Sequence, residues 1–101
     1  MPFFYVYVIQ SLHHDFVYVG ITKDLKRRFT EHTTGKNVST KPYVPYPLIF
    51  YEAYLSEQDA KKREKYLKTT KGKVTLRQML KNYFRAKDTS PAALRQVKWS
   101  G

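Results

Sequence analysis

Two short apolar runs near the start of the chain predict a β-hairpin. Residues 3–9 (FFYVYVI) and 16–22 (FVYVGIT) are rich in aromatic and β-branched side chains, which favour strands, and a polar turn separates them. Because side chains alternate along a strand, the hairpin has a tyrosine face and a valine face. The tyrosine face carries Tyr5, Tyr7, Ile9, Phe16, Tyr18 and Gly20. The valine face carries Phe4, Val6, Val8, Val17, Val19 and Ile21. Gly20 leaves a gap on the tyrosine face, where another group can approach closely.

After the hairpin the pattern changes to the 3.6-residue period of a helix. Thr22 or Asp24 can cap this helix, which is expected to end near Gly35. One stripe of the helix carries Leu25, Arg28, Phe29 and His32, at i, i+3, i+4 and i+7. We therefore expect Arg28 and His32 on the buried side of the helix.

A third strand and two further helices are predicted in the second half of the chain. Residues 48–54 (LIFYEAY) form the strand, after an irregular loop over residues 36–47. Ser56 opens the next helix through a capping pattern with Asp59. That helix is expected to run to about Thr69, and its inward stripe carries Ala60, Arg63, Glu64 and Leu67.

The last predicted helix lies between a glycine and the end of the regular pattern. Gly72 is expected just past the preceding helix, and Thr75 can cap the new one. Its apolar face carries Leu76, Met79, Leu80, Tyr83 and Phe84.

The predicted order β-β-α-β-α-α indicates an α+β domain, with a small antiparallel or mixed sheet packed by helices. A chain of 101 residues suits one domain, which we assign to residues 1–86. Residues 87–101 read as a C-terminal tail outside the regular pattern, and Trp99 is its only anchor.

The net charge of the chain indicates the class of its binding partner. The chain carries 19 basic and 8 acidic residues, a formal net charge of +11. Such a field attracts polyanions, so nucleic acid is the expected partner, ahead of an anionic membrane surface. Residues 3–9 lack the features of a signal peptide, no segment approaches a membrane span, and there is no cysteine. We expect a cytoplasmic protein without disulfides.

The inward-facing charges admit two interpretations. Arg28 and Glu64 can form a structural ion pair beside a satisfied His32, which is the simpler interpretation, or all three can line a shallow site at the edge of the core. The tyrosines of the hairpin are likewise typical of a half-buried sheet, although a phenol can also bind phosphate or pass on a proton. His13-His14-Asp15 is interpreted as a solvated turn, since a turn fixes no ligand geometry.

The ordered set of these residues resembles the GIY-YIG nuclease family, and its small single-domain members most closely. The resemblance rests on Tyr5-Val6-Tyr7, ten residues, Tyr18-Val19-Gly20, and the continuation YVGITKDLKRRFTEH that contains Arg28 and His32. It also covers SxxDAKKREKYLK, which contains Glu64, and the following KGK. In all it extends from about residue 3 to residue 84.

The resemblance implies a three-stranded antiparallel sheet flanked by helices, and cleavage of a DNA phosphodiester with one divalent metal ion, Mg²⁺ or Mn²⁺. By this likeness one of Tyr7 and Tyr18 is the base that activates the nucleophile. Arg28 stabilises phosphate charge, His32 assists proton transfer, and Glu64 is the single carboxylate that holds the metal. One departure is serious: many members carry an asparagine about twelve residues after the glutamate, where this chain has Leu76.

DNA contacts are expected from the loop over residues 36–47 and from the basic helices. The candidates are Lys26, Arg27, Lys36, Lys41, Lys61, Lys62, Lys65, Lys68, Lys71 and Lys73. Such contacts are mainly to phosphate, so binding would depend on salt and read little sequence.

Three function classes follow in order. The first is a metal-dependent DNA endonuclease with a preference for branched, damaged or single-stranded DNA, tied to repair, with RNA as an alternative substrate. The second is a nucleic-acid-binding module that keeps the fold and has little or no turnover. The third is a structural or protein-interaction domain, which the charge disfavours.

Overall fold

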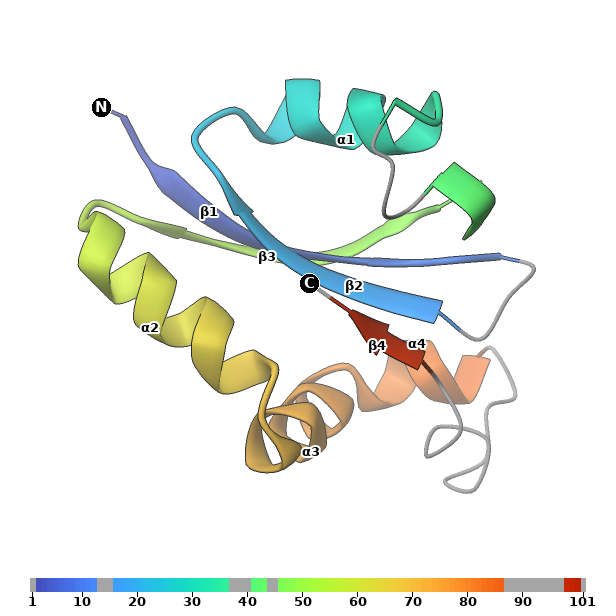
Figure 1. Cartoon of the computed structure of the whole chain (residues 1–101). Coiled ribbons are helices and arrows are strands. Elements are labelled where there is room, and N and C mark those ends of the chain that lie inside the picture. The colour runs from blue at the N-terminus through green and yellow to red at the C-terminus, as the bar shows by residue number, and fades with distance from the viewer. Residues whose placement is uncertain (1, 13–15, 37–40, 44–45, 87–97, 101) are drawn as a thin grey trace.

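A four-stranded sheet forms the centre of the molecule (Figure 1). The structure is a computed structural model, and the residues it describes are 2–12, 16–36, 41–43, 46–86 and 98–100. The strands are β1 (Phe4–Gln10), β2 (Phe16–Thr22), β3 (Leu48–Tyr54) and β4 (Lys98–Ser100), in the order β3-β1-β2-β4. The first three pair antiparallel, which confirms the predicted α+β unit. The short β4 adds a parallel pairing with β2, so part of the predicted tail, with Trp99 opposite Val17, rejoins the sheet.

The two faces of the sheet are covered by different helices (Figure 1). Helix α1 (Leu25–Thr33) covers the tyrosine face, and α2 (Glu57–Leu67), α3 (Thr70–Met79) and α4 (Lys81–Ala86) cover the valine face. The predicted division of the hairpin is confirmed, since the cores of the two faces are separate sets. The valine-face core contains Val6, Val8, Val17, Val19, Ala60, Leu67, Leu76 and Phe84. The tyrosine-face core contains Tyr7, Ile9, Phe16 and Tyr46.

The first two predicted helices begin at the capping residues that the sequence indicated. Asp24 caps α1 by accepting a hydrogen bond from the backbone N–H of Arg27 at 3.0 Å, and Ser56 caps α2 through the N–H of Asp59. Gly35 follows α1 with a φ of 75°, a left-handed conformation that costs glycine little.

The boundaries after α2 differ from the prediction. Thr69, and not Thr75, caps α3. Gly72, expected at the stop of α2, therefore lies inside the next helix. The reason is close packing between the two helices, because a Cβ on Gly72 would overlap the carbonyl oxygen of Tyr66. The predicted last helix is also two helices, interrupted at Leu80.

The remaining fold predictions have mixed outcomes. Met79, expected on the apolar face, is 46% exposed. A short 3-10 helix (Lys41–Tyr43) interrupts the predicted loop. His13-His14-Asp15 lies outside the described residues. No helix in the described part of the chain is long and apolar enough to cross a membrane.

We predict that Gly72→Ala destabilises the protein by about 2–3 kcal/mol, because the added methyl group forces α2 and α3 apart. Urea unfolding measures the change. Lys71→Ala, at an exposed position in the same turn, is the control and should change the free energy of unfolding by less than about 0.5 kcal/mol. Equal stability of the Gly72 variant and the native chain would contradict this packing.

Candidate functional site

The site is built around a buried phenol on β1. Tyr7 is 1% exposed and lies directly opposite Gly20 of β2. A Cβ on Gly20 would lie 2.5 Å from the Tyr7 hydroxyl and 2.8 Å from the ring of Tyr18. The gap predicted at Gly20 is therefore filled by the Tyr7 side chain itself, which reaches across the sheet toward β2.

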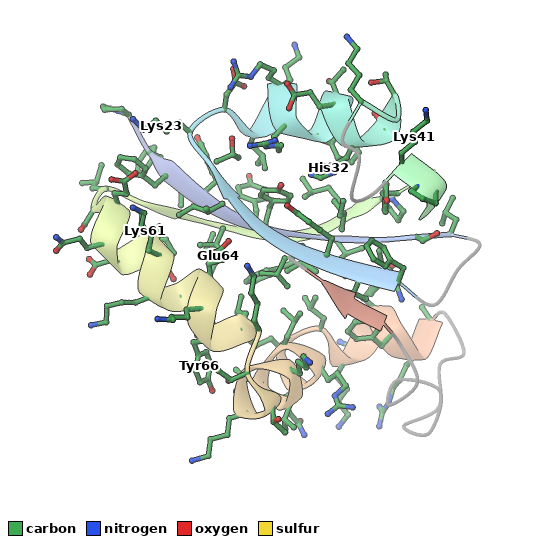
Figure 2. All side chains as sticks on the ribbon, in the orientation of Figure 1. Lys23, His32, Lys41, Lys61, Glu64 and Tyr66 are labelled. Atoms are coloured by element: carbon green, nitrogen blue, oxygen red, sulfur yellow. The ribbon has the colours of Figure 1, made fainter. Side chains whose placement is uncertain are left out.

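His32 reaches the same phenol from helix α1. Its Nε2 lies 2.9 Å from the Tyr7 hydroxyl oxygen, and its ring lies 4.9 Å from that of Tyr18 (Figure 2). The residue is fully buried, as the helical stripe predicted. Burial, together with the nearby positive charge of Arg28, lowers the pKa of His32 to about 4. The imidazole is therefore neutral at pH 7 and offers one nitrogen as an acceptor.

Tyr18 completes a row of three polar groups. Its ring lies 6.0 Å from that of Tyr7, and Tyr18 contributes to the shifted pKa of Tyr7, so the two phenols lie close enough to interact. Burial and the contact with Tyr18 raise the pKa of Tyr7 above its ordinary value. Tyr18 itself is partly exposed. The row thus runs from a partly exposed tyrosine, through a buried one, to a buried imidazole.

Arg28 brings positive charge to this row. Its charge opposes the rise in the pKa of Tyr7 and lowers the pKa of His32, so it lies within electrostatic range of both. The guanidinium pairs with Glu31 at 3.5 Å, with side chains 39% and 35% exposed. A solvated pair of this kind contributes little to stability, so Arg28 can exchange Glu31 for another anion.

Glu64 approaches from the opposite layer. Its side chain on α2 is 20% exposed and its Oε2 lies 3.2 Å from Nζ of Lys68 (Figure 2). The carboxylate contributes to the raised pKa of Tyr7, so it too lies near the phenol. The simpler sequence interpretation, an Arg28–Glu64 ion pair, is wrong. Each finds an opposite charge on its own helix, one turn away, and the two helices lie on opposite faces of the sheet.

Glu64 suits a hard divalent cation that keeps most of its water. Mg²⁺ is commonly held by one or two carboxylates, and one partly exposed carboxylate provides that. Among the residues that the structure describes, no three His, Asp or Glu side chains cluster closely enough to hold a metal ion by themselves. A cation here would therefore depend on water and substrate for its other ligands.

The predicted DNA-contacting residues lie on both sides of the sheet. Figure 2 places Lys41 on the side of α1 and Lys61 on the side of α2. Most of the set is exposed, whereas Lys68 is tied to Glu64. These residues therefore do not lie on a single face of the molecule.

One residue of the site, Tyr46, was not predicted from the sequence. Tyr46 is 3% exposed and its ring packs edge-on to His32, with centroids 6.1 Å apart. It lies in a proline-rich loop without periodicity, so no signal pointed to it. Leu76, at the position of the asparagine seen in related nucleases, is fully buried in the core, and Asn82 lies exposed on α4.

Residues 3–79 match the model of the GIY-YIG catalytic domain, a range that includes Tyr7, Tyr18, Arg28, His32 and Glu64. The chain belongs to the GIY-YIG family. The resemblance seen in the sequence is thereby confirmed, and the GIY-YIG domain marks a nuclease-type hydrolase with nucleic acid as its substrate class.

Three streptococcal proteins are similar to this chain over most of its length. A UPF0213 protein of Streptococcus agalactiae serotype V is 36% identical over 81 residues, covering 77% of this chain and 91% of the relative. UPF0213 proteins of Streptococcus pyogenes serotype M3 and Streptococcus pneumoniae serotype 4 are 34% and 32% identical over 68 residues. Each alignment covers 66% of this chain, and 73% and 68% of the respective relative. No solved structure matches the chain.

We predict that His32 titrates near pH 4, which proton NMR of its ring will measure. An exposed histidine of the unfolded chain protonates near pH 6.5, so burial makes the folded state less stable as the pH falls from about 6.5 toward 4. The difference corresponds to about 3 kcal/mol at the acid end. His32→Gln should reduce the pH dependence of urea unfolding in this window. An NMR midpoint above pH 6 would contradict the burial of this ring.

Proposed function

We propose that this GIY-YIG chain is a metal-dependent DNA endonuclease, in which Tyr7, Tyr18, Arg28, His32 and Glu64 form the active site. The observation that carries the proposal is the hydrogen bond of 2.9 Å between the Tyr7 hydroxyl and His32, with Tyr18 adjacent and two opposite charges within range. Two buried titratable groups in contact, with a third partly exposed beside them and shifted pKa values in both buried groups, are typical of functional sites.

Proton transfer is assigned to the tyrosine–histidine row. The partly exposed Tyr18 hydroxyl can contact a water molecule, whereas Tyr7 is enclosed. Tyr18 takes a proton from the attacking water as it passes its own to Tyr7, and Tyr7 passes its proton to Nε2 of His32. This requires the imidazole proton on Nδ1. Because Tyr7 never holds a full negative charge, its raised pKa does not block the relay.

Charge at the phosphate is assigned to the two partly exposed side chains. Arg28 leaves Glu31 and donates hydrogen bonds to the non-bridging phosphate oxygens, a geometry that guanidinium groups favour. The negative phosphate also favours protonation of His32, which raises its capacity as an acceptor. Glu64 would hold Mg²⁺ or Mn²⁺, which supplies charge neutralisation at the reacting phosphate when bound.

The substrate class rests on charge. A net charge of +11 and basic residues on both faces support phosphate contacts, which favour recognition of DNA form over sequence. We therefore propose branched, damaged or single-stranded DNA as the substrate and a role in repair. The cysteine-free composition is in keeping with a cytoplasmic location.

We predict that Glu64→Gln lowers Mg²⁺-dependent nicking of plasmid and branched DNA by about 100-fold or more, because the ligand charge is lost. Glu57→Gln is the matched control. Glu57 also pairs with a lysine one turn later on α2, at 3.9 Å, but lies away from the tyrosine row. Nicking that survives in the Glu64 variant would rule out this metal ligand.

We predict that Tyr18→Phe lowers the rate of nicking by about 10²–10⁴-fold, since it removes the hydroxyl that meets water. DNA binding in EDTA should stay within about twofold. Tyr66→Phe is the control, because it also removes a partly buried phenol contact, 2.6 Å from Thr75, on the other side of the sheet. If the native chain binds DNA and cleaves none of these substrates, the binding-module alternative is correct.

A further inference from the structure

A groove on the tyrosine face lies outside the residues of the proposed active site. It has a volume of about 510 Å³ and lies between β1, β3 and the first half of α1. Its floor is aromatic and apolar, with Tyr5, Tyr51 and Phe29 as its rings. Lys23 and Lys26 stand at its rim.

The aromatic floor is more exposed than core packing requires. Tyr51 is 54% exposed on β3, and its ring meets that of Tyr5 edge-on, with centroids 6.0 Å apart. Tyr5 is partly exposed and is also in contact with Phe3, at 6.3 Å. Exposed aromatic side chains on a sheet provide flat surfaces on which nucleobases stack, whatever their sequence.

The charges at the rim are complementary to a phosphate backbone. Lys23 and Lys26 are exposed, and neither forms an ion pair within the described part of the chain. The ammonium group of Lys23 lies 5.4 Å from the centre of the Phe4 ring, a contact that an exposed lysine can exchange for a phosphate. Asp24 also lines the groove, but its carboxylate caps α1 through the N–H of Arg27. The groove therefore combines stacking surfaces with one available cation, Lys26, and with Lys23, whose contact with Phe4 is exchangeable. Stacking surfaces beside cations are the combination that single-stranded nucleic acid requires.

We propose that this groove binds an unpaired nucleotide of single-stranded DNA, with its base on Tyr5 and Tyr51 and its phosphates at Lys23 and Lys26. The groove lies close to the tyrosine row, because Tyr5 and Tyr7 are alternate residues on one face of β1, about 7 Å apart along the strand. Tyr51 is the direct partner of Tyr7 on β3.

The relation of this groove to cleavage rests on the proposed function, whereas binding itself does not. If the chain cuts DNA at the tyrosine row, an unpaired flank in the groove would hold the neighbouring phosphate in place. A flap or a single-stranded end would then be preferred over a continuous duplex, in which stacked bases cannot enter the groove.

The test is fluorescence anisotropy with a labelled oligothymidylate and a matched duplex, in EDTA so that cleavage plays no part. Tyr51→Ala should weaken single-strand binding by about 5- to 100-fold and duplex binding by less than about twofold. Tyr51→Phe should bind as the native chain does, because the stacking surface is kept. Leu55→Ala is the control for loss of an exposed apolar side chain, since Leu55 is 58% exposed and does not line the groove.

Salt dependence separates stacking from charge. Tyr51→Ala should leave the slope of log affinity against log salt concentration unchanged, and Lys23→Ala should reduce it by about 0.7, one phosphate contact on a single strand. Equal loss for single strand and duplex, or no loss with Tyr51→Ala, would overturn the groove proposal. Tighter binding of an oligouridylate RNA than of the DNA would also overturn it.

These outcomes are independent of catalysis. If the chain binds single strands through Tyr51 and never nicks DNA, the groove proposal holds and the endonuclease proposal fails. If the chain nicks DNA and the Tyr51→Ala variant binds single strands as well as the native chain does, the endonuclease proposal holds and the groove proposal fails. Thermal unfolding of each variant, expected within a few degrees of the native chain for these exposed positions, checks that the fold is kept.

Discussion

The whole site depends on the absence of one side chain at Gly20. Only because β2 has no Cβ there can the Tyr7 ring extend across from β1 and present its hydroxyl to Tyr18 and His32. Any larger residue would displace the phenol and break the row. Gly20 is thus conformationally ordinary, and its importance is steric: it allows a tyrosine from the neighbouring strand to fill the space above it.

Burial and exposure are divided between the two kinds of group in the site. The groups assigned to proton transfer, Tyr7 and His32, are enclosed, and both are held in their neutral forms by loss of solvent. The charged groups, Arg28 and Glu64, remain partly solvated in weak pairs with residues of their own helices. Charged groups that keep their water can exchange partners at modest cost, while the neutral row stays fixed.

The side chains of the site come from helices on both faces of the sheet. Helix α1 supplies His32 and Arg28 from one face, and α2 supplies Glu64 from the other. Figure 2 shows His32 and Glu64 on opposite sides of the sheet. The groove at Tyr5 and Tyr51 lies on the tyrosine face beyond this row, toward β3. The tyrosine–histidine row and the aromatic residues of the groove thus lie next to each other on one face of the sheet.

Periodicity in the sequence was sufficient for the first three strands, the division of the hairpin into two faces, and the burial of His32 on α1, because alternation and the 3.6-residue repeat are local properties. It did not predict β4, which lies in the part of the chain assigned to the tail. Periodicity was not sufficient to predict which side chains contact one another. Whether Arg28 pairs with Glu64 or with Glu31 depends on which face of the sheet each helix covers. Whether Gly72 ends one helix or lies inside the next depends on how closely α2 and α3 pack. Tyr46 joins His32 from a loop without any repeat. The sequence determined which side chains face inward, and the tertiary structure alone decided which of them meet, because contacts between distant segments are set by packing across the sheet.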